Sequence, residues 1–385
     1  MARILVNAVS AKSGGAAAYI KNLIGTIGHR DSSNEYVFYI PSQIKVGPTI
    51  GNIRTVKCDV ALQRSWRRFL WDQFVLRRII KQNKIDVLLS SSDFGMFFPP
   101  CRQLLLLRNG LFFSEMYMKN FVTKKRIAAR IDIRFRRLLV MLSAYFSDLV
   151  MTASEHMLAE ARNFIRVGKS REMVNPFGVP LDRFKPREYT ESNGKIFQLV
   201  FISEYNDSKN LTVLLKAVLL LRERGIFDFS LLTTADPHQF PEVEVVNRQA
   251  DIQLLSLPLL RGCISVIEPV AYEKVPELYL MGDIFVFPSF VESFGHPLVE
   301  AMASGLPIVA SDIPICHEIC GDAAVYFDPF DAEQLAERIL QLKNNDEMRR
   351  TLMRLGRDRV KERFDWQSHV DRLICALYQL SGASA

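Results

Sequence analysis

Short apolar runs alternate with stretches of helical periodicity along almost the whole chain. The first run, RILVNAV at residues 3–9, precedes Gly14 and Gly15, and apolar residues at positions 19, 20, 23, 24 and 27 then keep the spacing of a helix. Strands that alternate with helices are typical of βαβ units, in which consecutive strands run parallel. The pattern therefore predicts an α/β protein built on parallel sheets.

The alternation forms two series on either side of a segment without periodicity. In the first series, further strand-like runs occupy residues 36–40, 85–90, 103–107, 148–154 and 172–176. In the second, they occupy residues 197–203, 229–234, 264–270, 283–289, 307–311 and 323–328. The segment between them, GVPLDRFKPREYTESNGK at residues 178–195, is rich in Pro, Gly and charged residues, which is typical of an interdomain linker.

The length of the chain agrees with two domains, because 385 residues exceed what a single core usually supports. We predict a first Rossmann-like domain at residues 1–178, a second at residues 179–364 and a terminal helical segment at residues 365–385. Two doubly wound domains that face each other form a central cleft between the carboxyl ends of their strands, and ligands of such folds bind there.

Charge is distributed unevenly between the two halves. Residues 1–185 hold 30 Lys and Arg against 13 Asp and Glu, whereas the remainder holds 19 against 29. Residues 119–137 alone carry eight basic residues against one Asp, and the apolar run LLVMLSAYF follows them. This basic amphipathic segment predicts an anionic membrane surface or an anionic lipid as a partner, with four basic residues facing it: Lys124, Lys125, Arg126 and Arg130. A solvated helix face is the alternative.

Several other classes of partner and site are not expected. No motif of a nucleic-acid-binding fold accompanies the basic segment. The six cysteines show no repeated spacing, which favours a reduced, cytoplasmic protein. Cys316, His317 and Cys320 lie close in sequence, but no second ligand pair follows at zinc-like spacing, so packing is the expected role. The start MARILVNAV is too short an apolar run for a signal peptide, and no run of about 18 apolar residues occurs.

The most informative stretch is VESFGHPLVEAMASG at residues 291–305, directly after the apolar run IFVF. Pro297 is well suited to the first position of a helix, which would place Glu300 in the first turn. Backbone amides near Gly295 and His296 would then donate to a phosphate or sugar oxygen, because helix amino termini expose unpaired N–H groups. Glu292 and Glu300 can each accept hydroxyl hydrogen bonds from a sugar or ribose. The alternative is a solvated Glu292 and a Glu300 that only complements the helix dipole.

The Glu-x7-Glu string, with its Phe-Gly and Ala-Met-Ala-Ser-Gly setting, resembles the retaining glycosyltransferases of family 4, which have the GT-B fold. The type that synthesises bacterial cell-surface polysaccharides is the one it resembles. The resemblance covers nearly the whole chain through six further segments: LVMTASEHMLAEA, NPFGVPLDRFKP, LYLMGDIFVFPS, LPIVASDIP, GDAAVYFDPFDAEQLAERI and FDWQSHVDRLICALYQL. In that family the last of these is a helix that crosses back to the first domain.

The resemblance implies a role for each matching residue. Glu300 would bind the nucleotide ribose, Glu292 would bind the transferred sugar, and Lys209 would stabilise the charge of the leaving diphosphate. Contacts with the sugar and the diphosphate would come from the loop around the first glutamate, at Ser293, Phe294, Gly295, His296 and Leu298. Gly14 and Gly15 would let the first helix approach the donor phosphates and the acceptor.

Two positions depart from the family pattern. Many relatives carry Gly-Arg where this chain has Ser203 and Glu204, so the usual arginine at the diphosphate is missing there. Many also carry a histidine where this chain has Asn109, beside Arg108. An amide can bind a sugar hydroxyl but cannot act as a base, so Arg108 and Asn109 are candidates for acceptor binding only. Simple loop residues are the alternative for both.

The family implies hexose transfer with retention at the anomeric carbon, by a front-face route in which the departing diphosphate helps to deprotonate the attacking hydroxyl. No Asp-x-Asp metal motif occurs, and neither a metal ion nor another cofactor is expected. The donor is a nucleotide diphosphate sugar, with mannose on a guanosine carrier ranked before glucose, N-acetylglucosamine and rhamnose. The base would be read near IEPVAYEKVPEL. The acceptor is a saccharide or a lipid-linked saccharide such as a lipopolysaccharide core, at the inner face of the cytoplasmic membrane.

Other functions on the same fold stay open. A sugar-nucleotide epimerase or a phosphorylase would also need two domains and a cleft. A nicotinamide dehydrogenase is disfavoured because no Gly-x-Gly-x-x-Gly follows the first strand. A nucleotide-sugar-binding protein that has lost transfer is the non-enzymatic alternative, and the departures at Glu204 and Asn109 are what make it worth testing.

Overall fold

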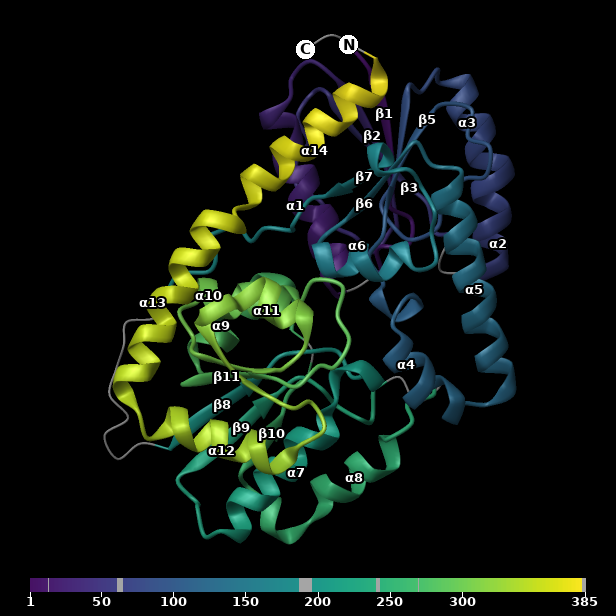
Figure 1. Ribbon diagram of the computed structural model, residues 1–385. Helices are drawn as coiled ribbons and strands as arrows, with labels where there is room; N and C mark the ends of the chain where they lie inside the picture. The colour runs from purple at the N-terminus through teal and green to yellow at the C-terminus, as the bar shows by residue number, and fades with distance from the viewer. Residues whose placement is uncertain (13, 61–64, 187–195, 240–242, 269, 383–385) are drawn as a thin grey trace. The chain divides into compact units, whose positions relative to one another are not determined.

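The computed structural model describes residues 1–12, 14–60, 65–186, 196–239, 243–268 and 270–382 (Figure 1). It divides into two compact units. Unit 1 comprises Met1–Phe113, Ile131–Pro176 and Trp366–Ala385, and unit 2 comprises Ser114–Arg130 and Phe177–Asp365. The sequence prediction of a first domain at residues 1–178 therefore differs from the structure at Ser114–Arg130, which packs with unit 2. Of the expected linker, residues 187–195 lie outside the described residues.

Unit 1 contains a seven-stranded parallel sheet in the order β3-β2-β1-β4-β5-β6-β7. Its strands are β1 (Arg3–Asn7), β2 (Glu35–Ile40), β3 (Ile53–Lys57), β4 (Val87–Ser90), β5 (Arg102–Leu106), β6 (Leu149–Thr152) and β7 (Glu172–Val174). The chain starts in the middle and builds outward on both sides of β1, which is the doubly wound arrangement. The sequence pattern missed β3, an edge strand whose residues IRTVK are mostly solvated and so lack a continuous apolar run.

The helices of unit 1 are α1 (Gly14–Arg30), α2 (Ser65–Leu70), η2 (Trp71–Leu76), α3 (Arg77–Gln82), η3 (Gly110–Phe112), α6 (Glu155–Arg162), η5 (Lys169–Arg171) and α14 (Trp366–Ser381). α5 (Ile127–Tyr145) begins in unit 2 and continues in unit 1.

The last helix, α14, packs on α1 (Figure 1). His369 is fully buried between the Tyr19 hydroxyl at 3.2 Å and the Pro176 carbonyl oxygen at 3.0 Å. Burial lowers the pKa of His369 to about 3, so the imidazole is neutral and can donate to the carbonyl while accepting from the hydroxyl. Trp366 adds a hydrogen bond of 2.9 Å to the Thr26 hydroxyl. Helix α14 is thus an integral part of unit 1.

Unit 2 contains a six-stranded parallel sheet in the order β10-β9-β8-β11-β12-β13. Its strands are β8 (Phe197–Phe201), β9 (Phe229–Thr233), β10 (Ile264–Val266), β11 (Ile284–Phe287), β12 (Ile308–Ser311) and β13 (Ala324–Phe327). Two parallel, doubly wound sheets confirm the predicted fold class.

The α-helices of unit 2 are α4 (Glu115–Asn120), α7 (Leu211–Glu223), α8 (Arg248–Ser256), α9 (Val275–Leu280), α10 (His296–Ala303), α11 (Pro314–Cys320), α12 (Ala332–Lys343) and α13 (Asp346–Arg363). Short helical turns are η4 (Val122–Lys124), η6 (Asp207–Lys209), η7 (Pro258–Leu260), η8 (Tyr272–Lys274) and η9 (Gly321–Ala323).

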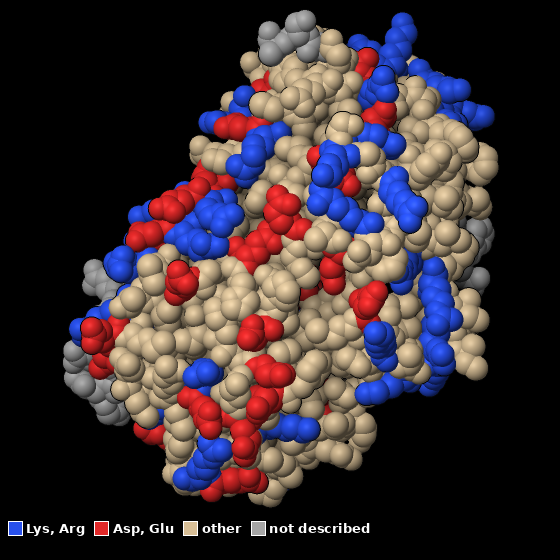
Figure 2. All heavy atoms as spheres, viewed as in Figure 1, with Lys and Arg blue, Asp and Glu red and all other residues tan. Residues whose placement is uncertain are grey.

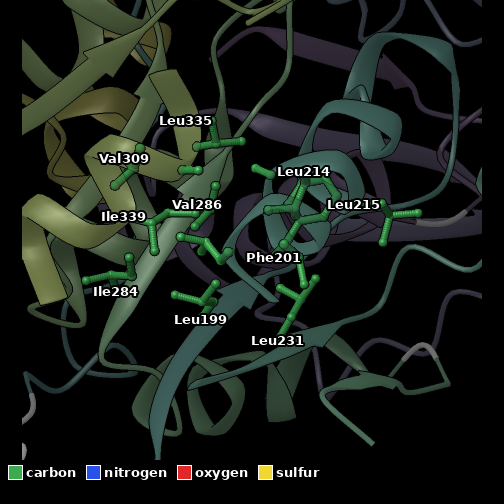
Figure 3. Packing of buried hydrophobic residues seen from close by; sticks show 14 of the residues in the cluster. Leu199, Phe201, Leu214, Leu215, Leu231, Ile284, Val286, Val309, Leu335 and Ile339 are labelled. Carbon is green, nitrogen blue, oxygen red and sulfur yellow. The ribbon is translucent and has the colours of Figure 1, made fainter. Parts of the chain in front are cut away.

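The core of unit 2 lies between its sheet and helices α7 and α12 (Figure 3). Leu214 of α7 points into a layer formed by Leu199 and Phe201 of β8 and by Leu231 of β9, and all four side chains are fully buried. Strands buried on both faces read as near-continuous apolar runs, which is why IFVF of β11 could be recognised in the sequence. This core supports the strand ends that carry the candidate site.

Cys316 and Cys320 are buried free thiols in α11, as expected of packing residues. Among the described residues, no group of three or more His, Cys, Asp or Glu side chains is arranged to hold a metal ion. No helix in the described part of the chain combines the length and the apolar character that crossing a bilayer requires.

We predict that Leu214→Ala lowers the free energy of unfolding by about 2–5 kcal/mol, because it leaves a cavity in this core. Leu280→Ala, at an exposed position of α9, is the matched control and should cost far less. Urea denaturation followed by circular dichroism measures both. Equal losses for the two variants would contradict the placement of Leu214.

Candidate active site

The segment that follows β11 and enters the first turn of α10, residues 288–298, is here called the motif loop. Gly295 caps α10 with a φ of 83°, and a Cβ there would lie 3.1 Å from the Leu298 side chain. A residue with a side chain would therefore be strained by its backbone conformation as well as crowded. His296 is the first residue of α10 and Pro297 the second, so the prediction of Pro297 at the first position is wrong by one residue.

Glu300 is the fifth residue of α10, so the prediction that it lies in the first turn is also wrong. Its side chain instead points into the interior, and the residue is only 6% exposed. The Tyr279 hydroxyl of α9 donates a hydrogen bond of 2.9 Å to the Glu300 carboxylate. This geometry argues against a role for Glu300 that is limited to complementing the helix dipole, because such a role does not require burial.

Burial raises the pKa of Glu300 to about 7, while hydrogen bonds from Tyr279 and Tyr272 oppose the shift. Burial and the neighbouring carboxylate also raise the pKa of Tyr279 well above its usual range, so its hydroxyl stays a donor. Sequence analysis missed both tyrosines as site residues, although Tyr272 lies in the stretch expected to read the base. The available signal was a hydroxyl-bearing aromatic residue in the otherwise apolar segment LYLMG.

Lys209 and Glu292 form an ion pair between the Nζ and Oε1 atoms. Lys209 ends η6, which follows β8, and Glu292 lies in the loop after β11, the strand paired with β8. Their side chains are 16% and 12% exposed, so both are largely shielded from water. The structure thus joins two of the predicted site residues that are 83 positions apart in the sequence.

Asn210 explains why these loops meet. It adopts a left-handed conformation with a φ of 54° directly before α7. Its side-chain amide donates to the Pro288 carbonyl oxygen at 3.2 Å and to the Pro329 carbonyl oxygen at 2.6 Å. One buried amide thereby links the loops after β8, β11 and β13.

The remaining residues of the motif loop divide by burial. Phe294 and Leu298 are buried, and Phe294 packs edge-on against Phe177 at 5.4 Å and Phe364 at 5.7 Å. The imidazole of His296 stacks on Phe177 at 4.8 Å. Ser293 is half-buried. The side chains of Phe294 and Leu298 hold the loop in place, which leaves the backbone as the part able to meet a ligand.

Glu204 stands exposed after β8, where the family pattern has an arginine. Its neighbour Ser203 is tied to Thr234 by hydrogen bonds of 2.8 and 2.9 Å that use its backbone N–H and carbonyl groups. The departure seen in the sequence therefore places a carboxylate on the surface next to the loop that carries Lys209.

In unit 1, Arg108 links two of the predicted segments at the start of α1. Gly14 opens α1 with a φ of 56°, and the carbonyl oxygen of Gly15 accepts a hydrogen bond of 3.2 Å from the Arg108 guanidinium. The Asn109 side chain accepts from the Leu111 backbone N–H at 3.1 Å and so caps η3.

Asp93, which was not predicted as a site residue, supports the backbone of Arg108 and Asn109. Its Oδ1 atom accepts from the backbone N–H groups of Arg108 at 2.8 Å and of Asn109 at 2.9 Å. Burial raises the pKa of Asp93, while these hydrogen bonds and the Arg108 charge oppose the shift. The spacing of the sequence could not predict the contacts of Asp93 with residues 15 and 16 positions later, because these contacts depend on the pairing of strands β4 and β5.

The predicted membrane-facing group requires one correction. Lys125 is buried, and its Nζ atom lies 2.6 Å from Asp207 Oδ2, with side chains only 6% and 5% exposed. A lysine so enclosed cannot face a membrane. Lys124 and Arg126 are exposed and Arg130 is half-buried, and Lys and Arg side chains gather along α5 (Figure 2).

We predict that Glu300→Gln makes the protein more stable at pH 8 relative to the wild type than at pH 5. The native carboxyl has a pKa of about 7 against an ordinary value of 4.5, so the native state binds more protons between these values. Unfolding therefore becomes easier as the pH rises through this window, by up to about 3 kcal/mol, and the glutamine removes this effect.

Urea denaturation at pH 5 and pH 8 measures the difference, with Glu277→Gln at an exposed position of α9 as the matched control. If the free energy of unfolding of Glu300→Gln minus that of the wild type does not rise between pH 5 and pH 8, the burial of Glu300 is contradicted.

Comparison with known proteins finds similarity over the carboxyl-terminal half of the chain, which includes Lys209, Glu292 and Glu300. Residues 182–359 match the family described as glycosyl transferases group 1. The O-antigen chain mannosyltransferase B of Escherichia coli is 35% identical over 124 residues, which cover 32% of this chain and 32% of that protein. The MMP alpha-(1->4)-mannosyltransferase of Mycolicibacterium hassiacum is 28% identical over 234 residues, which cover 60% and 53%. The alignments thus span between a third and about half of the length of these relatives.

Solved structures match the whole chain at low identity. Sucrose-phosphate synthase from Thermosynechococcus elongatus has a TM-score of 0.78 at 17% identity and covers 100% of both chains. WaaG, a glycosyltransferase involved in lipopolysaccharide biosynthesis, has a TM-score of 0.72 at 16% identity over 99% of this chain and 100% of its own. The solved structures therefore show that the chain has the GT-B fold, and its residues 182–359 are similar to the glycosyl transferases group 1 family.

Proposed function

We propose that the protein is a retaining glycosyltransferase that moves a hexose from a nucleotide diphosphate sugar to a saccharide or lipid-linked acceptor. One observation carries this proposal: Lys209 and Glu292 are paired at the carboxyl ends of adjacent strands, and the helix after the second strand buries Glu300. An ammonium and two carboxylates match the diphosphate and the hydroxyl groups of such a donor.

The ion pair gives each partner a role when the donor arrives. The diphosphate carries more negative charge than Glu292, so it competes for the Lys209 ammonium. Glu292 is then released to accept hydrogen bonds from the hydroxyls of the transferred sugar. Lys209, already oriented, stabilises the charge that develops on the leaving diphosphate without reorganisation at the moment of transfer.

Glu300 is proposed to bind the ribose. The proposal is supported by Tyr279, whose hydroxyl donates a hydrogen bond to this buried carboxylate. Vicinal ribose hydroxyls would add charge-assisted hydrogen bonds and favour the ionised form. The donor-binding role extends to the backbone of Phe294, Gly295, His296 and Leu298 and to Ser293, and Gly14 and Gly15 are proposed to approach the donor phosphates and the acceptor.

Mannose is the first choice for the transferred sugar, because two of the relatives named above are mannosyltransferases. A glucosyl donor is the next choice, because a structural neighbour, HepE of Anabaena, was solved with UDP-glucose, with a TM-score of 0.72 at 15% identity. Transfer with retention and without a metal ion is part of the proposal through the family resemblance. Arg108 and Asn109 are the proposed acceptor contacts.

A binding protein without transfer activity is the second candidate, and the exposed Glu204 favours it. A carboxylate in place of an arginine next to the Lys209 loop repels a diphosphate instead of attracting it. The two candidates differ in turnover but not in donor binding.

The proposed place of action is the inner face of the cytoplasmic membrane, against an anionic surface. Five large apolar side chains of α5 are between 49% and 73% exposed, and they fall on one face at helical spacing: Ile127, Ile131, Phe135, Leu138 and Tyr145. Arg130 and Arg134 lie along the edge of this apolar stripe in the helical sequence. A helix with an apolar face and a basic margin is suited to the headgroup region of an anionic bilayer.

We predict that isothermal titration calorimetry with guanosine, uridine, adenosine and thymidine diphosphate sugars finds one preferred donor. Lys209→Met should weaken its binding by at least about tenfold, because a hydrogen bond to a charged group contributes roughly 1.5–3 kcal/mol. Glu300→Gln should weaken it as well. Lys216→Met, at an exposed position of α7, is the matched control and should bind like the wild type.

No binding of any nucleotide sugar by the wild type would contradict the proposed function. Binding with no transfer to any saccharide or lipid-linked acceptor, and no donor hydrolysis, would favour the second candidate. The anomeric configuration of a transferred sugar, read by nuclear magnetic resonance, tests retention separately.

For the membrane, we predict sedimentation with vesicles that contain phosphatidylglycerol and weaker sedimentation with phosphatidylcholine alone. Replacing Arg130 and Arg134 by Gln should weaken binding by about 1 kcal/mol per charge. Replacing Ile131 and Phe135 by Ser should weaken it on both kinds of vesicle, because buried apolar area is lost. Met281→Ser, an exposed apolar residue of unit 2, is the control, and equal binding by all variants would remove the basis of this surface.

A further inference from the structure

Residues Ser114–Arg130 are here called the strap. In the sequence they lie between two segments of unit 1, but they pack as part of unit 2. The Ser114 hydroxyl caps α4 by accepting from the Tyr117 backbone N–H at 3.3 Å. Tyr117, Phe121 and Val122 are buried. A segment with this much buried apolar surface is held firmly in unit 2, even though both of its ends continue into unit 1.

The first anchor of the strap is the ion pair between Lys125 and Asp207. The Lys125 ammonium also donates to the Glu244 carbonyl oxygen at 2.5 Å, and the other oxygen of Asp207 accepts from the Val246 backbone N–H at 2.7 Å. Asp207 opens η6, the turn that ends at Lys209. The strap therefore holds the turn that carries the donor-site lysine.

The second anchor is an aromatic stack. The ring of Phe121 lies 4.5 Å from that of Phe290, with 14° between the ring planes. Phe290 is buried two residues before Glu292, and its backbone N–H donates to the Ser208 carbonyl oxygen at 3.0 Å. The strap thus touches both loops of the candidate site, each at a residue two positions before Lys209 or Glu292.

The ion pair between Lys125 and Asp207 is not explained by stability alone. Taking two charges out of water costs about as much as their attraction returns, so a buried ion pair is a weak source of stability. Such pairs can instead specify one arrangement among several of similar energy. Here the arrangement specified is that of the turn and the loop that hold the Lys209–Glu292 pair.

We infer that Lys125 and Phe121 are positioning residues for the donor site, acting through Lys209 and Glu292. This inference rests on the proposed function, because it assigns a consequence to the placement of those two side chains. The strap continues directly into α5, so residues from the amino-terminal half of the sequence complete the donor site in the carboxyl-terminal half.

The test is a double-mutant cycle on nucleotide binding. GDP and UDP are titrated separately by calorimetry into wild type, Lys125→Met, Lys209→Met and the double variant. If Lys125 acts through Lys209, then Lys125→Met weakens binding about tenfold and the double variant binds no more weakly than Lys209→Met alone. Lys119→Met, an exposed lysine of the strap, is the matched control and should bind like the wild type.

Phe121→Leu keeps the inference testable if Lys125→Met fails to fold, because it removes the ring stack while nearly conserving an apolar side chain. It should weaken nucleotide binding with thermal unfolding still cooperative. Wild-type binding by both strap variants, or additive losses in the double variant, would overturn the inference while leaving the proposed function intact. Failure of the wild type to bind GDP and UDP, and every sugar nucleotide above, would overturn both.

Discussion

The side-chain amide of Asn210 is the constraint on which the candidate site depends. By donating to Pro288 and Pro329, it ties the chain after β8 to the chain after β11 and β13. The Asn210 amide is buried, so both carbonyl oxygens would lose their hydrogen-bond donor if the loops separated. Buried polar groups without a partner are costly. The parallel sheet brings the strand ends to one edge, and Asn210 then determines the spacing between them. Lys209 and Glu292 meet because they flank this junction.

The charges of the candidate site are suited to the negatively charged donor that we propose. Lys209 and Glu292 neutralise each other while largely shielded from water, and Glu300 has a pKa near neutrality because of its burial. Each carboxylate is therefore held where additional hydroxyl donors stabilise its charged form. Lys125 and Asp207, which is two residues before Lys209, also form an ion pair that is shielded from water. The site is thus organised before a ligand arrives, which is the condition for electrostatic catalysis.

Much of the fold could be predicted from the sequence because strands buried on both faces leave continuous apolar runs. IFVF of β11 is such a run, whereas β3, in which only Ile53 is buried, leaves none. The motif loop could be located because Gly, Pro and the two glutamates lie within 15 residues. The turn of α10 that carries Glu300 was placed too early, because the helix begins at His296 rather than at Pro297.

Long-range partners could not be predicted by the same reasoning. In the sequence, Lys125 is one basic residue among several in a charged run. Only the packing of the strap with unit 2 shows that it forms an ion pair with Asp207, 82 positions later. Tyr279 reads as part of an apolar helix until its hydroxyl is found against Glu300. Asp93 is likewise invisible as a support for Arg108 and Asn109. In each case the partner is determined by strand order and chain packing, which local patterns do not encode.

A crystal structure of the protein with the nucleotide sugar that it prefers would test the proposed donor site. We expect the ribose hydroxyls within hydrogen-bond distance of the Glu300 carboxylate, the diphosphate on the Lys209 ammonium, and Glu292 released from Lys209 to the sugar. A donor bound elsewhere, or bound while Lys209 and Glu292 stay paired and Glu300 contacts only its tyrosines, would contradict it.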